Sequence, residues 1–249
     1  MPHTSPRPDV PLRSTSRDPR TTGPLPAAVL WDMDGTLVDT EPAWMGAEIA
    51  LVEEFGGTWA PADAVQMIGL PLLDSAAILR DHGVPLDVEE IASRLVQGVA
   101  RAISESLVWQ PGARELLTAL RDSGVPCALV TMSYRVLAEA VVARAPGGVF
   151  DVLVTGDEVT HGKPDPEPYL RAADLLGVDV TECVAVEDSR PGIASALASG
   201  ARTLGVQHIV PVDAQPGLSR TDSLARIGLR DLAVLRSGGQ IDHLDGQPG

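Results

Sequence analysis

Residues 27–36 read Ala-Ala-Val-Leu-Trp-Asp-Met-Asp-Gly-Thr, a short apolar run that ends in two acids. A run of this length, rich in apolar side chains and bounded by a glycine, is typical of a strand buried on both faces of a parallel sheet. Alternate residues of a strand project to the same side, so Asp32 and Asp34 are predicted to emerge close together at its end. Gly35 permits the sharp turn that follows.

Four more apolar runs follow along the chain, at residues 127–131, 151–155, 183–186 and 201–206. Stretches with helical character alternate with them, at residues 113–123, 134–144, 166–176 and 192–198. Strands that alternate with helices indicate an α/β fold built on a parallel sheet.

This alternation is interrupted once, between the first strand and residue 113. The interval contains no strand-like run, and its patterns predict helices at residues 44–55, 72–82 and 88–106. The last of these has an apolar residue at every fourth position, which gives it one apolar face. We therefore predict that a helical module is inserted just after the first strand.

The two ends of the chain have a different composition. Residues 1–26 are rich in Pro, Arg, Ser and Thr, which predicts a disordered tail, and they lack the apolar segment of a secretory signal. An organelle transit peptide is the alternative interpretation, and the cytoplasm is the expected location. Residues 237–249 (SGGQIDHLDGQPG) are predicted to be a second disordered tail.

The charge balance argues against two classes of partner. The chain has 34 acidic and 19 basic residues and a net charge of −15, so it repels nucleic acid and anionic lipid. No apolar run is long enough for a transmembrane helix. The two cysteines, Cys127 and Cys183, lie in apolar stretches and are predicted to be buried thiols rather than part of a disulfide framework or a zinc site.

Polar side chains follow the other predicted strands as well. Thr131 and Ser133 follow the second strand, the sole lysine, Lys163, follows the third, and Glu187 and Asp188 end the fourth. Since ligands bind at the carboxyl edge of open α/β sheets, we expect these groups to share one crevice with the acids of the first strand.

Four carboxylates in one crevice would repel one another or take up protons. A hard divalent cation resolves this, and Mg²⁺ suits oxygen ligands and leaves room for a phosphate. Lys163 and the Thr131 hydroxyl would then contact the other phosphate oxygens. A carboxylate can attack phosphorus and form an aspartyl-phosphate, while its neighbour handles the proton. The predicted reaction class is phosphoryl transfer.

Residues 32–42 (DMDGTLVDTEP) resemble the haloacid dehalogenase-like superfamily, in the branch of β-phosphoglucomutase and sugar-phosphate phosphatases. Thr131, residues 162–166 (GKPDP) and residues 186–189 (VEDS) follow in the family's order. The resemblance covers residues 27–235. It implies a Rossmann-like core of residues 27–40 and 109–236, and a helical cap of residues 41–108.

The resemblance also implies the roles of individual residues. Asp32 would be the nucleophile and Asp34 the general acid and base, while Thr131 and Lys163 would hold the phosphoryl group. Mg²⁺ would be bound by Asp32, the backbone carbonyl of Asp34 and Asp188, with Glu187 close by.

Two departures from the family pattern bear on the substrate. Trp44 stands where the mutase branch has a histidine, and the cap loop of residues 67–71 has no arginine for a second phosphate. Both favour a phosphatase. Met132 stands where an asparagine is common, and Ser133 is expected to compensate. Trp44 is predicted either to line the substrate cleft or to pack within the cap.

The predicted function is therefore a Mg²⁺-dependent phosphatase that acts on a small phosphorylated metabolite, a sugar or polyol phosphate. The expected assembly is a monomer or a small homo-oligomer. Two alternatives remain: a sugar-phosphate mutase of the same fold, and a catalytically silent binding or regulatory relative.

Overall fold

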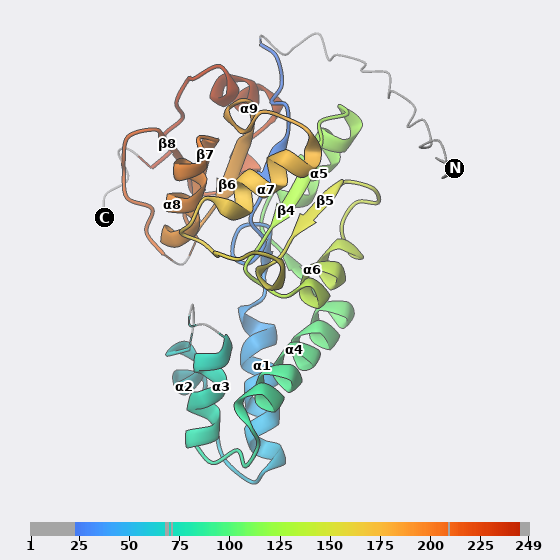
Figure 1. Cartoon of the computed structure of the whole chain (residues 1–249), viewed down its shortest axis with the longest axis vertical. Helices are drawn as coiled ribbons and strands as arrows, with labels where there is room; N and C mark the ends of the chain where they lie inside the picture. The colour runs from blue at the N-terminus through green and yellow to red at the C-terminus, as the bar shows by residue number, and fades with distance from the viewer. Residues whose placement is uncertain (1–22, 68–69, 71, 209, 245–249) are drawn as a thin grey trace, which may run out of the picture.

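The computed structural model describes residues 23–67, 70, 72–208 and 210–244. Its centre is a parallel six-stranded sheet of order β5-β4-β1-β6-β7-β8 (Figure 1). The strands are β1 (Val29–Trp31), β4 (Cys127–Val130), β5 (Val152–Val154), β6 (Val184–Glu187), β7 (Arg202–Val206) and β8 (Leu218–Thr221). The predicted α/β fold with a Rossmann-like parallel sheet is confirmed.

Strand β1 lies in the middle of this sheet because all its side chains are apolar and fully buried. Val29 and Trp31 point into one hydrophobic cluster, and Leu30 points into another on the opposite face. The sheet is thus covered on both faces, which explains why the strand at its centre is a continuous apolar run.

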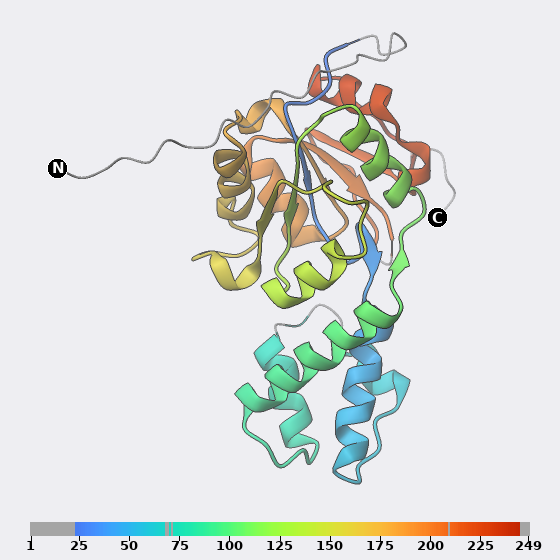
Figure 2. The ribbon, with the colours of Figure 1, turned by 90° about the vertical axis from the view of Figure 1, so that its right-hand side faces the viewer.

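Five helices cover the two faces: α5 (Ala113–Asp122), α6 (Arg135–Val142), α7 (Glu167–Leu176), α8 (Arg190–Ser199) and α9 (Leu229–Arg236). Buried residues of α5, α6 and α9 belong to the cluster of Val29 and Trp31. Buried residues of α7, and Ala196 of α8, belong to the cluster of Leu30. Figure 2 shows α7 and α8 on the opposite side of the sheet from α5 and α9. Short 3₁₀ turns lie at Gly156–Glu158, Val180–Glu182 and Leu224–Arg226.

Four helices form a separate body beyond one end of the sheet (Figures 1 and 2): α1 (Glu41–Glu54), α2 (Pro61–Val65), α3 (Leu72–Asp81) and α4 (Val88–Glu105). They share a hydrophobic cluster of their own that includes Leu51, Trp59, Leu79 and Leu95. The two connections to the sheet pair as short antiparallel strands, β2 (Val38–Asp39) and β3 (Val108–Trp109).

The C-terminal segment differs from its prediction. The disordered tail predicted for residues 237–249 is wrong for residues 237–244, because residues 237–239 bond to the end of helix α9 and residues 241–243 pair with strand β8. The Arg220 N–H donates to the Ile241 carbonyl at 2.8 Å, and the His243 N–H donates to the Arg220 carbonyl at 2.9 Å. Residues 245–249 lie outside the described residues.

At the other end, residues 1–22 of the predicted tail also lie outside the described residues, whereas Leu25 packs against the core. Cys127 and Cys183 are free and buried, as predicted. Among the described residues, no helix has the length and apolar character needed to cross a membrane.

Candidate active site

Three carboxylates meet where the adjacent strands β1 and β6 end. Asp32 follows β1, and its N–H donates to the Val186 carbonyl at 3.0 Å, which places it beside Glu187, the last residue of β6. Oxygens of Asp32, Glu187 and Asp188 lie within 4.8 Å of one another. The shared carboxyl edge of the sheet therefore brings these acids together, as the strand pattern predicts.

Lys163 is inserted between two of these carboxylates. Its Nζ donates to Asp32 Oδ1 at 2.7 Å, to Glu187 Oε1 at 2.6 Å and to the Val130 carbonyl at 2.9 Å. These contacts use all three of its donors, and only 5% of its side chain is exposed. Because both charges of each pair are buried, removing one partner would leave the other uncompensated.

Glu187 is fully buried and accepts hydrogen bonds at both oxygens. Oε1 also accepts from the Tyr169 hydroxyl at 2.9 Å. Oε2 accepts from the N–H groups of Asp188 and Ser189, both at 3.1 Å, and from Ser189 Oγ at 3.0 Å. Ser189 Oγ in turn accepts from the Gly192 N–H at 3.1 Å, which caps helix α8. To bind a cation directly, Glu187 would have to release one of these donors.

The Asp34 carboxylate accepts hydrogen bonds from three hydroxyl groups. Thr40 Oγ1 donates to its Oδ1 at 2.7 Å, while Ser133 Oγ and Thr131 Oγ1 donate to its Oδ2 at 2.8 Å and 3.1 Å. The two hydroxyls predicted to bind the substrate thus contact the second carboxylate of the motif. Three donors fix the orientation of this carboxylate.

Burial and neighbouring negative charge raise the pKa of two of these carboxylates, Asp32 and Asp188. Burial raises the pKa of Asp32 well above its ordinary value, Glu187 raises it further, and Lys163 opposes the change. Burial, with Glu187 again adding to it, raises the pKa of Asp188 to about 7, although a hydrogen bond from Thr36 at 3.2 Å lowers it. A bound cation would relieve this repulsion.

The residues present fit a Mg²⁺ ion. Asp32 Oδ2 is buried and has no hydrogen-bond partner within the described part of the chain. Such an atom is costly unless something else satisfies it. The surrounding ligand atoms are carboxylate oxygens, which this cation prefers. Gly35 has a φ of +86°, and a Cβ there would collide with the Asp188 carboxylate, so this turn requires glycine.

Two predicted substrate-binding residues have different surroundings. The Met132 sulfur accepts from the Lys163 N–H at 3.3 Å, so its side chain supports the loop that carries the lysine. Trp44 is half-buried and packs against both the core cluster and the cluster of α1–α4. It therefore lies at the junction of the two bodies, and none of its described contacts is with the acids.

Four contributors were not predicted: Thr36, Thr40, Tyr169 and Ser189. Thr36 and Thr40 lie within residues 32–42, and Ser189 stands at the start of a helix. Their positions in the sequence could therefore have indicated a place beside the acids. Nothing in the sequence could have indicated Tyr169 as a site residue, because an aromatic residue on an amphipathic helix indicates only a buried face.

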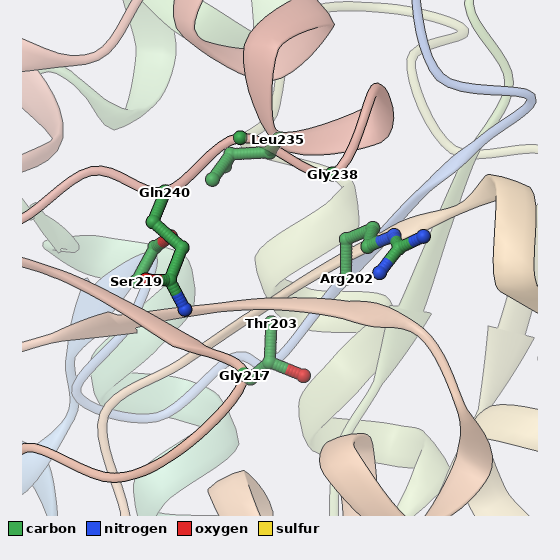
Figure 3. Close-up of a pocket in the computed structure, with 8 residues that line it drawn as sticks. Arg202, Thr203, Gly217, Ser219, Leu235, Gly238 and Gln240 are labelled. Carbon is green, nitrogen blue, oxygen red and sulfur yellow. The ribbon is translucent and has the colours of Figure 1, made fainter.

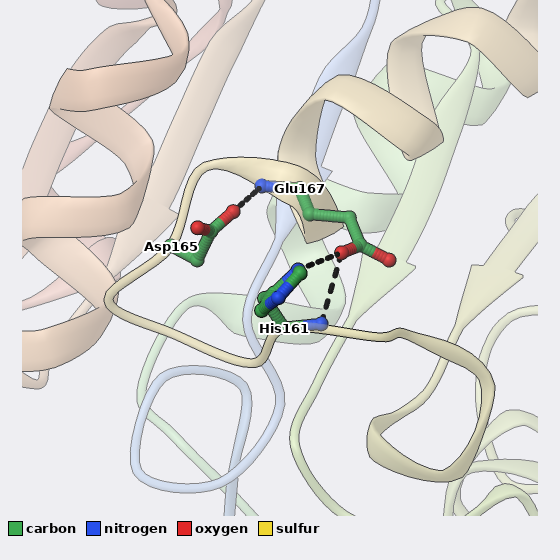
Figure 4. A group of neighbouring side chains, drawn as sticks. All are labelled: His161, Asp165 and Glu167. Carbon is green, nitrogen blue, oxygen red and sulfur yellow. Dashed lines mark hydrogen bonds and ion pairs between the residues drawn. The ribbon is translucent and has the colours of Figure 1, made fainter.

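A second acidic group, on the loop before α7, braces the backbone (Figure 4). The Glu167 carboxylate accepts from the N–H groups of Thr160 and His161 at 2.7 Å and 2.9 Å, and contacts His161 Nδ1 at 3.1 Å. Asp165 Oδ1 accepts from the Glu167 N–H at 2.9 Å. These bonds stiffen the loop that contains Lys163.

A small cavity of about 50 Å³ lies at the opposite edge of the sheet (Figure 3). It is lined by residues at the amino ends of β7 and β8, among them Arg202 and Gly217, and by Gln240 of the C-terminal segment. It has no part in the acidic cluster.

Known proteins resemble this chain in sequence. Residues 26–200 match the family of haloacid dehalogenase-like hydrolases. The chain is 34% identical over 184 residues to a phosphorylated carbohydrates phosphatase of Thermotoga maritima. This alignment covers 73% of this chain and 85% of that protein. It is 31% identical over 188 residues to a bifunctional riboflavin kinase/FMN phosphatase of Arabidopsis thaliana. That alignment covers 74% of this chain but only about half, 49%, of the Arabidopsis protein.

Among solved structures, CbbY from Rhodobacter sphaeroides in complex with phosphate superimposes with a TM-score of 0.74 and 26% identity. The match covers 84% of this chain and 99% of that one. The fold is therefore shared over the sheet and the helical body.

Proposed function

The chain is a phosphatase that belongs to the haloacid dehalogenase-like hydrolase family, and we propose that it hydrolyses a small phosphorylated carbohydrate through an aspartyl-phosphate on Asp32. One observation carries the proposal. The Asp32 carboxylate ends the central strand with Oδ1 held by Lys163 and with Oδ2 buried and without a partner in the described chain. Lys163 thus fixes the orientation of this carboxylate at the end of the central strand, and a fixed orientation of the nucleophile is what attack on phosphorus requires.

In the first half of the reaction, an Asp32 oxygen forms a bond to phosphorus while the bond from phosphorus to the sugar or polyol oxygen breaks. Asp34, in its protonated form, gives its proton to the departing oxygen. In the second half, Asp34 accepts a proton from water as the water oxygen attacks phosphorus. The acyl-phosphate bond then breaks, which releases inorganic phosphate and restores the Asp32 carboxylate.

The neighbouring groups hold the phosphoryl group during both halves. Lys163 lies beside Asp32, and Thr131 and Ser133 lie beside Asp34. Each of the three is proposed to exchange one of its present acceptors for a phosphoryl oxygen when the substrate binds. Mg²⁺ would be held by Asp32, Asp188 and the backbone carbonyl of Asp34, with Glu187 beside it, and when bound it would neutralise charge on the phosphoryl oxygens.

Residues 41–108 are proposed to act as a cap over the site. Helix α1 begins at Glu41, directly after Thr40, whose hydroxyl donates to Asp34, so the start of the cap is connected to the acid–base residue by a hydrogen bond. A cap that closes over this edge would exclude water during the first half of the reaction. Trp44, at the junction of cap and core, is proposed to contact the leaving group. Trp44 stands where the mutase branch has a histidine, and this favours a phosphatase over a mutase.

Phosphate release from a panel of sugar and polyol phosphates tests the proposal, with wild type and Asp32→Asn assayed in Mg²⁺ and in EDTA. We expect metal-dependent release that Asp32→Asn abolishes. Equal release by Asp32→Asn, or no release from any carbohydrate phosphate, would refute it. Isomer formation that depends on a sugar bisphosphate would favour the mutase alternative, and absence of both activities would favour the silent relative.

A further inference from the structure

Tyr169 is one of only two tyrosines in the chain and lies directly beneath the acidic cluster. It belongs to helix α7, is completely buried, and packs in the cluster that contains Leu30 and Val130. Both neighbours lie on strands that lead into the site. Its ring therefore has a fixed position relative to the ends of β1 and β4.

The Tyr169 hydroxyl and Lys163 share one acceptor. Glu187 Oε1 accepts from the hydroxyl at 2.9 Å and from Lys163 Nζ at 2.6 Å, and Nζ lies 5.3 Å from the centre of the tyrosine ring. The other carboxylate oxygen is held by the start of α8. Glu187 is thus fixed at both ends, by the N-terminus of α8 at one oxygen and by the tyrosine at the other.

The position of the Lys163 ammonium depends on the position of Glu187. Lys163 sits on a flexible four-carbon stem, and its ammonium has no preferred geometry of its own. Its contacts with Glu187 Oε1, Asp32 Oδ1 and the Val130 carbonyl define where it stands. If Glu187 rotated, the ammonium would follow Oε1 and move relative to Asp32.

We infer that Tyr169 is a positioning residue, whose hydroxyl fixes Glu187 and thereby holds the Lys163 ammonium against the Asp32 carboxylate. This inference rests on the proposed function for its effect on turnover. The position of Lys163 itself can be measured without turnover, so the two claims fail separately.

Tyr169→Phe removes the hydroxyl and keeps the ring. Loss of such a supporting hydrogen bond is expected to lower kcat about 10-fold. KM should stay within about twofold, because Thr131 and Ser133, the other two proposed phosphoryl contacts, have no described contact with Tyr169. Tyr134→Phe makes the same chemical change at the other tyrosine, which is 39% exposed, and serves as the matched control.

The second readout uses the fact that Lys163 is the only lysine. Selective ¹⁵Nζ-lysine labelling gives one ammonium signal in the NMR spectrum, and that signal reports on Lys163 alone. We expect the signal to shift or broaden in Tyr169→Phe and to stay at the wild-type position in Tyr134→Phe.

A ¹⁵Nζ signal that is unchanged in Tyr169→Phe would overturn the inference whatever the kinetics show. So would a Tyr169→Phe enzyme that retains wild-type kcat. A shifted signal in a protein whose wild type releases no phosphate would support the positioning of Lys163 and refute the proposed function.

Discussion

Replacing Glu48 by glutamine should stabilise the protein at alkaline pH and leave its stability unchanged at acidic pH. Glu48 lies on α1 with 5% of its surface exposed, and Trp59 Nε1 donates to its Oε2 at 3.2 Å. Burial raises its pKa from 4.5 to about 7; the Trp59 hydrogen bond opposes the change, and the charge of Glu41 adds to it. Glutamine retains an acceptor for Trp59 but carries no charge.

The direction in which the stability of the wild-type protein changes with pH follows from proton binding. The folded protein holds the Glu48 proton more tightly than the unfolded chain, so folding is favoured fully below pH 4.5, and this advantage is lost as the pH rises to about 7. At about 1.36 kcal/mol per pKa unit the shift corresponds to about 3 kcal/mol. Relaxation of the surroundings around the charged carboxylate reduces this value, so we expect about 1–2 kcal/mol.

Urea unfolding of wild type and Glu48→Gln across this pH range, without divalent cations, measures the difference. The variant should match wild type at pH 4.5 and exceed it by about 1–2 kcal/mol at pH 8. Glu53→Gln, at an exposed position on the same helix, is the control and should show no such trend. A difference that does not vary with pH, or one that grows as the pH falls, would refute the reasoning.

The remaining predictions concern the acidic cluster. Gly35→Ala introduces a Cβ into the Asp188 carboxylate at a φ of +86° and should lower kcat at least about 100-fold, whereas Gly46→Ala, in open space on α1, should leave phosphate release unchanged. Mg²⁺ at about a hundredfold excess over its Kd should raise the Tm by about 5–10 °C, and calorimetry should show no such rise for Asp188→Asn. Thr40→Val removes the 2.7 Å hydrogen bond to Asp34 and should lower kcat about 10-fold in steady-state assays; an unchanged kcat would show that Asp34 is oriented without it.

Much of the fold could be predicted because the inner strands are buried on both faces. The inner strands β1, β4 and β6 are almost entirely apolar, and together with β7 and the edge strand β5 they coincide with the predicted runs. Strand β8 does not, since three of the four residues in its sequence Leu-Ser-Arg-Thr are polar.

The polar residues of β8 are buried because distant residues satisfy them. Arg220 Nη2 contacts Asp242 Oδ2 at 2.6 Å, and the Ser219 hydroxyl accepts from the Ile241 N–H at 3.1 Å. These partners belong to the segment predicted to be disordered. Local patterns could indicate neither the strand nor the ordered tail, because each depends on the other.

At the site, the position of a side chain in the sheet was more predictable than its contacts. Parallel strands end at one edge, so the meeting of Asp32, Lys163 and Asp188 follows from topology. The direction of Thr131 toward Asp34, and the support of Glu187 by Tyr169, depend on rotamers and on helix packing that no sequence spacing encodes.

Trapping the covalent intermediate tests the central claim most directly. In Asp34→Asn the leaving group of acetyl phosphate needs no proton, but water lacks its base, so a phosphoenzyme should accumulate. Acid quenching followed by peptide mass spectrometry should place one phosphoryl group on Asp32, and Asp32→Asn should carry none. Phosphorylation of another residue, or turnover by wild type with no phosphoryl group on Asp32 in the Asp34→Asn protein, would contradict the account.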